Sequence, residues 1–277
     1  MTPAGSLSEI AAFARHHDPD RFLCALFAAP DRREALFALI AYNHELARAR
    51  EAARTPLVAL MRLQWWRDAV AQAAAGTPAR RHEVATPLHA AIGAGLLDAV
   101  DLLGLADARE AEAEKTGLTT EAAFQAYLRG TAGGFAVAAG RLLGAPAALL
   151  PALQAAGAAY GLAGVLRSVP ALARQGRCLL PNDALAAAGL TPEEAVADPG
   201  SAAVRGVVAR LAAAGRPAAA GLAKALRGLP RGASAAALPL VLARRDLRRL
   251  ALGRRCPAER GVGDRLAVGL AGLRGRV

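Results

Sequence analysis

The chain has 277 residues, enough for one large domain with a sizeable buried core, so its stability requires no disulfide framework or structural metal. Hydrophobic residues make up 54% of the chain and aromatic residues 4%, which favours helices over strands, and the mean hydropathy of +0.26 excludes a disordered protein. The net charge of +11 suits a nucleic acid, an anionic membrane surface or a phosphorylated ligand, and charge alone does not choose among them.

Apolar residues at helical spacing, punctuated by proline and glycine, predict one helix after another. A first helix is expected over 30–53, where Leu36 and Leu39 fall on one face. Thr55 is a good N-cap and Pro56 suits the first helical position, so a second helix begins there. Helices are expected over 57–74, 88–103, 119–143, 147–174, 201–226, 233–252 and 257–273.

Two short segments interrupt the helical pattern. Residues 176–181 read GRCLLP, which is typical of an ordered loop. Thr191, with Glu194 three residues later, predicts a capping box and a short helix behind it. The sequence contains no clear linker, no repeat of fixed period and no alternating strand pattern. It therefore predicts a single all-α domain over 1–277, with its core over about 20–255.

Membrane and redox features point to the cytoplasm. Residues 1–10 lack a basic region followed by an apolar run, so no signal peptide is predicted. Cys24, Cys178 and Cys256 have no metal-ligand spacing and suit a reducing compartment. Residues 142–166 carry no charge and are long enough to cross a bilayer, but prolines interrupt a stretch rich in alanine and glycine. We expect a helix at the centre of a bundle there instead.

Several common site motifs are missing from the sequence. There is no glycine-rich loop ending in Gly-Lys-Ser/Thr, no HExxH zinc motif, no GxSxG nucleophile elbow and no Cys/His set with zinc spacing. Nonspecific nucleic-acid binding would fit the charge, but no recognisable nucleic-acid-binding module accompanies it. A specific nucleic-acid partner is therefore not expected.

Three segments together carry the informative pattern. Residues 37–51 read FALIAYNHELARARE, residues 62–68 read RLQWWRD and residues 160–181 read YGLAGVLRSVPALARQGRCLLP. In order, spacing and character they resemble the squalene/phytoene synthase family over most of the chain, most sharply in RLQWWRD and in the GRxxLP loop. The resemblance implies the all-α isoprenoid synthase fold of trans-prenyl synthases. It also implies that the helix around 37–51 faces the helix around 155–172 across a central cavity.

Catalytic members of that family have two Asp-rich clusters on facing helices, whose carboxylates bind Mg²⁺ and activate a diphosphate leaving group. By the resemblance, the first cluster falls on residues 47–51, of which only Glu51 is acidic. The second falls on Ser168 and Leu172, and neither is a carboxylate. Nearby arginines such as Arg167 would repel divalent cations. We therefore expect no metal, and no cofactor in place of the Mg²⁺ of the active members.

The segment NxELARxRE, followed by RLQWWRD, is similar to a degenerate branch of the family that includes the mitochondrial assembly factor for respiratory complex I. Members of that branch are regarded as non-catalytic. The resemblance implies a protein that has lost both Asp-rich motifs and binds an isoprenoid or lipid, or serves in respiratory-complex assembly. The alternative is an active prenyltransferase that condenses isoprenoid diphosphates, with arginine and histidine in place of Mg²⁺.

No catalytic residue is predicted, but six residues are candidates for the cavity or its ligand: Asn43, His44, Arg48, Glu51, Arg167 and Arg177. Three of them follow the spacing i, i+1 and i+5 along one helix. They could line one cavity, or equally form a satisfied polar cluster inside the bundle. Trp65 and Trp66 are expected to pack in the core or at an interface.

The C-terminal third is rich in arginine. Arg244, Arg245, Arg248 and Arg249 fall at i, i+1, i+4 and i+5 and predict a basic stripe beside apolar positions. Such a stripe suits an anionic membrane surface or a membrane-bound assembly intermediate. The expected location is the cytoplasm, with peripheral attachment to the inner membrane face. The alternative is a solvated face that keeps the protein soluble.

Overall fold

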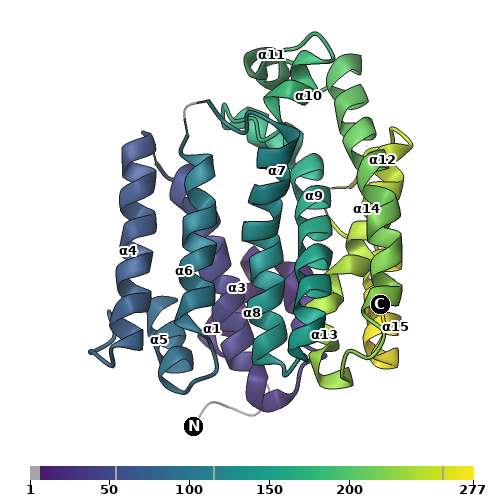
Figure 1. The fold of residues 1–277 in the computed structure, drawn as a ribbon. Coiled ribbons are helices and arrows are strands. Elements are labelled where there is room, and N and C mark those ends of the chain that lie inside the picture. Colours follow the sequence, from purple (N-terminus) through teal and green to yellow (C-terminus); the bar gives the residue numbers. More distant parts are fainter. Residues whose placement is uncertain (1–6, 54, 115, 258) are drawn as a thin grey trace.

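The computed structural model describes residues 7–53, 55–114, 116–257 and 259–277, and all regular structure in these ranges is helical, as predicted (Figure 1). The α-helices are α1 (Glu9–His17), α2 (Pro19–Ala25), α3 (Pro30–Glu51), α4 (Pro56–Ala74), α5 (Ala85–Gly93), α6 (Ala99–Ala108), α7 (Glu121–Leu128), α8 (Gly134–Leu142), α9 (Leu150–Arg174), α10 (Asn182–Ala186), α11 (Pro192–Ala197), α12 (Ala202–Ala225), α13 (Ser234–Ala237), α14 (Pro239–Ala251) and α15 (Val262–Arg274). Short 3₁₀ or π segments lie between them: η1 (Arg109–Glu112), η2 (Arg129–Gly133), η3 (Ala147–Leu149) and η4 (Arg231–Ala233).

The helix starts follow the capping chemistry of the sequence. The Thr55 hydroxyl accepts a hydrogen bond from the Val58 backbone N–H, directly before Pro56 opens α4. Thr191 and Glu194 form the predicted capping box: the Glu194 N–H donates to the Thr191 hydroxyl at 3.2 Å, and the Thr191 N–H donates to the Glu194 carboxylate at 2.8 Å. Both predictions are confirmed because they depend only on residues close in sequence.

The prediction of one helix over 88–103 is wrong. α5 ends at Gly93, and Gly95 turns the chain with φ +68°, a conformation that favours glycine. Asp98 then caps α6 by accepting a hydrogen bond from the Val100 N–H at 2.8 Å. The segment expected over 233–252 is likewise divided at Leu238, and α15 begins later than predicted. α1 and α2 precede the first helix that the sequence pattern indicated.

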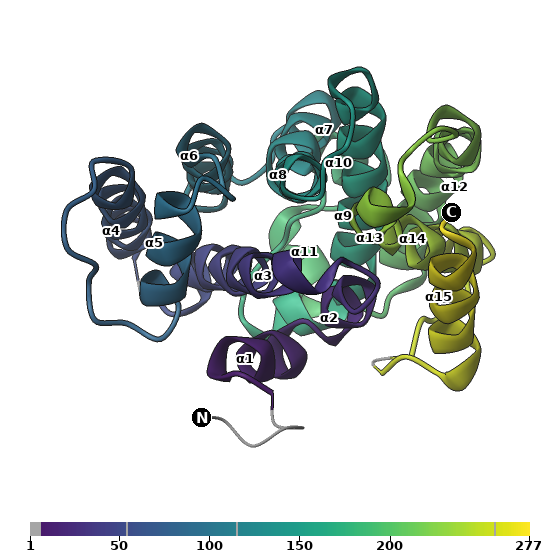
Figure 2. The ribbon, with the colours of Figure 1, turned by 90° about the horizontal axis from the view of Figure 1, so that it is seen from below.

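α9 occupies the centre of the bundle, between α8 on one side and α12 and α14 on the other (Figures 1 and 2). α4 lies at one edge of the molecule in both views, and α12 and α15 lie at the other. Among the described residues, 147–174 are the one helical stretch whose length and hydropathy would allow it to cross a membrane. Its packing against helices on several sides places it where the sequence predicted, inside the bundle.

Small residues let α9 approach the segment formed by η2 and α8. A side chain at Gly157 would overlap the Ala132 carbonyl oxygen and would lie 2.7 Å from the Ala136 Cβ. At Gly161 it would lie 2.7 Å from the Ala132 Cβ. Such contacts are closer than side-chain carbon atoms tolerate. The backbones of these helices therefore meet directly.

We expect Gly157→Ala to lower the free energy of unfolding by about 1–3 kcal/mol, because the new methyl group must displace the facing backbone. Gly164→Ala is a matched control in the same helix, where a Cβ meets nothing within 4 Å. There the better helix propensity of alanine should raise stability by up to about 1 kcal/mol. Urea denaturation followed by circular dichroism measures both changes. Equal stability of the two variants would contradict the close approach.

Candidate functional site

A cavity of about 630 Å³ lies between α3 and α9. α3 contributes Asn43, Ala47 and Glu51, which are spaced four residues apart and therefore share one helix face. α9 contributes a face that includes Gly164 and Ser168. The prediction that helix 37–51 faces helix 155–172 across a central cavity is confirmed.

One end of the cavity holds a buried ion-pair network around Glu112, whose side chain is 5% exposed. The Glu112 carboxylate accepts hydrogen bonds from Arg177 at 2.5 Å, from Arg109 at 2.6 Å and from the Tyr127 hydroxyl at 2.8 Å. Burial alone would raise the pKa of Glu112, but Arg109 and Arg177 outweigh it and hold that pKa below its ordinary value. Glu112 is therefore a carboxylate that is already paired with two arginines.

Arg177 connects this network to α3. Gly176 adopts φ +69° at the end of α9, which turns the GRxxLP loop back toward the cavity. There the Arg177 guanidinium also lies 3.8 Å from the Glu51 carboxylate. Arg109 donates a hydrogen bond to the side-chain oxygen of Asn43 at 3.3 Å. Both carboxylates that line the cavity are thus engaged by arginine.

The other end of the cavity is lined by Arg21, Tyr160 and Arg167. Arg21 donates to Asp18 at 2.7 Å, and its guanidinium lies over the Tyr160 ring, 4.8 Å from the ring centroid. The Tyr160 hydroxyl donates to Asp20 at 3.2 Å. This end is held by residues of α2 and α9, which are far apart in sequence.

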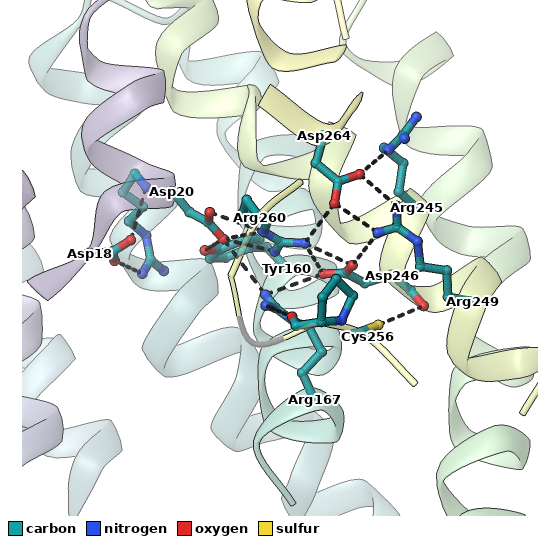
Figure 3. Close-up of polar contacts among 12 residues, drawn as sticks. Asp18, Asp20, Tyr160, Arg167, Arg245, Asp246, Arg249, Cys256, Arg260 and Asp264 are labelled. Carbon is teal, nitrogen blue, oxygen red and sulfur yellow. Dashed lines mark hydrogen bonds and ion pairs between the residues drawn. The ribbon is translucent and has the colours of Figure 1, made fainter. Parts of the chain in front are cut away.

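A second ion-pair network adjoins that end, and Figure 3 shows its members converging from α2, α9, α14 and α15. Arg260 lies 2.8 Å from Asp20 and 2.7 Å from Asp246. Arg167 is 3.8 Å from Asp20 and 3.5 Å from Asp246. Asp246 is buried, with its side chain 1% exposed. The network ties the C-terminal segment to the wall of the cavity.

Asp264 extends this network to the last helix (Figure 3). Its buried carboxylate accepts hydrogen bonds from Arg249 at 2.9 Å and from Arg245 at 2.5 Å. Hydrogen bonding from Arg249 is the main cause that lowers the pKa of Asp264 to about 2, and burial opposes it. Arg245 and Arg249 are therefore both ion-paired to Asp264, whereas Arg244 and Arg248 are exposed. Two of the four arginines in the predicted stripe are thus held against a carboxylate of the protein.

Four of the six predicted cavity residues line the cavity: Asn43, Glu51, Arg167 and Arg177. His44 and Arg48 do not, and this part of the prediction is corrected. At about 100° per residue they point about 100° and 140° away from Asn43, whereas Ala47 and Glu51 stay within about 80°. The ring of His44 stacks on His17 of α1, with 4.2 Å between ring centroids, and Arg48 pairs with Glu45 on the outer surface.

The sequence analysis missed four residues that line the cavity: Arg21, Arg109, Glu112 and Tyr127. They lie outside the three segments that carry the family resemblance. In the sequence each one is a single polar residue, which does not by itself indicate a site. Such positions become informative only once the fold shows which face they occupy. Trp66 is buried and Trp65 partly buried, as expected of packing residues.

The residues of the cavity do not fit a Mg²⁺ site. Ala47, Ser168 and Leu172 lie in the cavity wall at the positions where the resemblance implies carboxylates. Glu51 and Glu112 are the carboxylates present, and Arg177 contacts both. Throughout the residues that the structure describes, no group of three or more His, Cys, Asp or Glu side chains is placed to hold a metal ion. Mg²⁺ prefers several free oxygen ligands in octahedral geometry.

Comparisons with known proteins agree with this architecture. The family model described as squalene/phytoene synthase matches residues 14–256. A dehydrosqualene synthase solved in complex with ligand superposes with a TM-score of 0.78 at 12% identity, covering 96% of this chain and 95% of that one. The squalene synthase HpnC from Alicyclobacillus acidocaldarius gives a TM-score of 0.67 at 16% identity, covering 96% of this chain and 92% of the other. These likenesses show the fold.

Curated relatives come from mammals. The protein named NADH dehydrogenase (ubiquinone) complex I, assembly factor 6, from Bos taurus is 27% identical over 197 residues, covering 70% of this chain and 58% of the relative. Its Homo sapiens counterpart is 27% identical over 183 residues, covering 65% of this chain and 54% of the relative. This chain thus spans little more than half the length of these relatives.

Replacing Glu112 tests the buried network. We expect Glu112→Gln to destabilise the protein by about 3–5 kcal/mol, because Arg109 and Arg177 lose their shared carboxylate in a buried site. Glu110→Gln is the matched control: Glu110 is half exposed and pairs with Arg67, so its loss should cost less than about 1 kcal/mol. Urea titrations of both variants give the comparison. A similar small effect for both would contradict the importance of the network.

We expect His44 to make the stability of the protein depend on pH. Burial, followed by the proximity of His17 and Arg48, lowers the pKa of His44 to about 4 from its ordinary 6.5, and its Nε2 has no hydrogen-bond partner in the described part of the chain. Between pH 6.5 and 4 the unfolded chain binds a proton that the folded chain does not, so stability should fall as the pH falls. In His44→Gln the slope should become shallower. Thermal melts across this range measure it, and an unchanged slope would refute the assignment.

Proposed function

This chain belongs to the squalene/phytoene synthase family, and from that premise we propose that it is a non-catalytic member. In this proposal it binds an isoprenoid or another lipid in its central cavity and serves in the assembly of a respiratory complex. It works in the cytoplasm, attached peripherally to the inner membrane face. The absence of carboxylates from the cavity wall at Ala47, Ser168 and Leu172 carries the proposal.

Loss of the metal sites removes the means of ionising a diphosphate. In the active members, bound Mg²⁺ neutralises the charge that develops on the leaving group. Here Arg177 contacts the carboxylates of both Glu51 and Glu112, and recruiting Glu112 to a metal would require breaking a buried ion pair. Breaking such a pair is costly because an uncompensated charge remains behind.

The lining of the cavity suits an amphiphilic ligand. Gly164 and Val165 on α9 line the cavity, and a Cβ at Gly164 would meet nothing within 4 Å, which leaves room there for a hydrocarbon chain. Arginines stand at both ends of the cavity, and Arg174 lines it as an exposed guanidinium. A molecule with an apolar chain and an anionic group therefore matches both the shape and the charge of the site.

The assembly role draws its support from the curated relatives, which are named as assembly factors of complex I. Their similarity covers about two thirds of this chain, and this chain covers little more than half of theirs. A non-catalytic bundle with an intact cavity is compatible with a role as a binding partner during assembly. No carboxylate cluster is needed for such a role.

One observation favours a second candidate function, an active prenyltransferase of phytoene or squalene synthase type with an altered site. Arg21, Arg109, Arg167, Arg174 and Arg177 all line the cavity. Fixed guanidinium groups can stabilise negative charge that develops on a phosphate group. Four of the five, however, already contact carboxylates, which reduces the charge they can offer to a leaving group.

The two functions are separated by assays of binding and turnover. We expect farnesyl diphosphate to bind without Mg²⁺, measured by calorimetry, and to be recovered unchanged, measured by release of pyrophosphate and by product extraction. Gly164→Leu should weaken this binding at least about tenfold, because the added side chain enters the cavity where nothing lies within 4 Å of a Cβ. Gly206→Leu on the exposed face of α12 is the matched control and should bind as the wild type does.

Other outcomes count against the proposal. Mg²⁺-dependent release of pyrophosphate together with a condensed prenyl product would establish the prenyltransferase instead. Equal binding by Gly164→Leu and the wild type would place the ligand outside the cavity. Failure to bind farnesyl diphosphate, farnesol or a phospholipid would remove the ligand-binding part of the proposal.

A further inference from the structure

α15 has two opposite faces of different character. Its inner face carries Asp264, Val268 and Gly272, which are buried at intervals of four residues. Gly272 packs directly under the ring of Phe27, where a side chain would lie 2.5 Å from the nearest ring atom. Asp264 is held by Arg245 and Arg249. This face fixes the helix firmly to the body of the protein.

The outer face of α15 is an apolar ridge without a partner. It consists of four side chains that are each at least half exposed: Val262 (73%), Leu266 (60%), Leu270 (51%) and Leu273 (65%). At about 100° per residue, all four project between about 120° and 160° from Val268 on the inner face. α15 lies at the edge of the molecule, outside α14 (Figure 2). The ridge therefore faces outward over three turns.

Arginines flank the ridge. Arg265 and Arg274 are exposed and project on opposite sides of it, each about 90° from its centre. Neither has an ion-pair partner in the described ranges. The described residues from 239 onward expose one acidic side chain, Glu259, and seven arginines: Arg244, Arg248, Arg254, Arg255, Arg265, Arg274 and Arg276. The other two acidic residues there, Asp246 and Asp264, are buried in ion pairs.

We propose that α15 is an interfacial helix that docks the protein on an anionic lipid surface, with the ridge Val262, Leu266, Leu270 and Leu273 inserted among the acyl chains and Arg265 and Arg274 at the headgroups. An apolar face bordered by basic residues is the pattern of helices that lie in a membrane interface. Each arginine near an anionic leaflet adds attraction that a neutral surface does not supply.

A lipid surface fits this face better than a protein partner does. Four aliphatic side chains present less than the roughly 800 Å² per partner that a stable protein interface buries. A second copy of this chain would bring the same arginines against one another, and like charges repel. A bilayer accepts a narrow ridge without shape complementarity and provides the negative charge.

This inference rests on the proposed peripheral location. It assigns the contact with the membrane to α15, whereas the sequence analysis assigned it to the arginine stripe of α14. It does not depend on the cavity ligand, because the ridge and the cavity share no residues. Gly164→Leu, which obstructs the cavity, should therefore leave lipid attachment unchanged. The two proposals can fail independently.

The test is co-sedimentation of the full chain with vesicles of phosphatidylcholine alone or with added phosphatidylglycerol. We expect binding to the anionic vesicles at low salt, little binding to neutral ones, and weaker binding at about 0.5 M salt, where screening shortens the range of the attraction. The variant Leu266→Gln/Leu270→Gln/Leu273→Gln keeps every charge and should lower the partition coefficient at least about tenfold. Its substitutions are exposed, and circular dichroism melts verify that it folds.

The matched control is Leu57→Gln/Leu60→Gln/Met61→Gln on α4, at the opposite edge of the molecule, where exposed apolar residues also occur. It should bind vesicles as the wild type does. Arg265→Gln/Arg274→Gln should reduce the preference for anionic over neutral vesicles. A Leu270→Trp reporter should be quenched by brominated acyl chains.

Three results would overturn the proposal. One is the absence of vesicle binding at low salt. Another is equal loss of binding in the α4 and α15 variants, which would indicate nonspecific hydrophobic adsorption. The third is a dimer in solution that the α15 variant converts to a monomer without any effect on vesicle binding, which would assign the ridge to a protein interface.

Discussion

The need to neutralise buried charge governs the centre of this protein. Glu112 is almost fully buried, and a carboxylate in that position is tolerated only because Arg109, Arg177 and the Tyr127 hydroxyl all donate to it. Arg177 reaches it because the loop after α9 turns back at Gly176. The same guanidinium lies 3.8 Å from the Glu51 carboxylate, so one arginine contacts both carboxylates in the cavity.

A second network of buried ion pairs adjoins the cavity at Arg167. Arg260 and Arg167 bridge Asp20 and Asp246, and through Asp264 the network extends to α15. Asp264 therefore points inward with Val268 and Gly272, and the apolar residues of α15 are left on the outside. The exposed ridge is a consequence of the buried ion pairs. In a soluble helical bundle it is unusual for a helix to bury a charged residue such as Asp264 while its apolar residues are exposed to solvent.

Local chemistry explains which predictions were confirmed. The starts of α4 and α11 follow from Thr55, Thr191 and Glu194, whose hydrogen bonds close within one turn. The break at Gly95 was missed because apolar spacing continues across it. His44 and Arg48 were assigned to the cavity from proximity in sequence, although helical geometry directs them toward α1 and the solvent. Residue spacing is informative only when it is converted into an angle around the helix.

The sequence by itself determined the all-α class, the family segments and the absence of carboxylates at Ala47, Ser168 and Leu172, because these depend on residue identity and short spacing. Only the tertiary structure decided that Glu112, Arg109 and Tyr127 lie beside Arg177 at the cavity. It also decided that Arg245 and Arg249 form ion pairs with Asp264. Although Arg109 and Glu112 are only three residues apart in sequence, Arg177 is 65 residues from Glu112, and Arg245 and Arg249 are 19 and 15 residues from Asp264. Ion pairs over such separations exist only where helix packing brings the groups together, which no local pattern records.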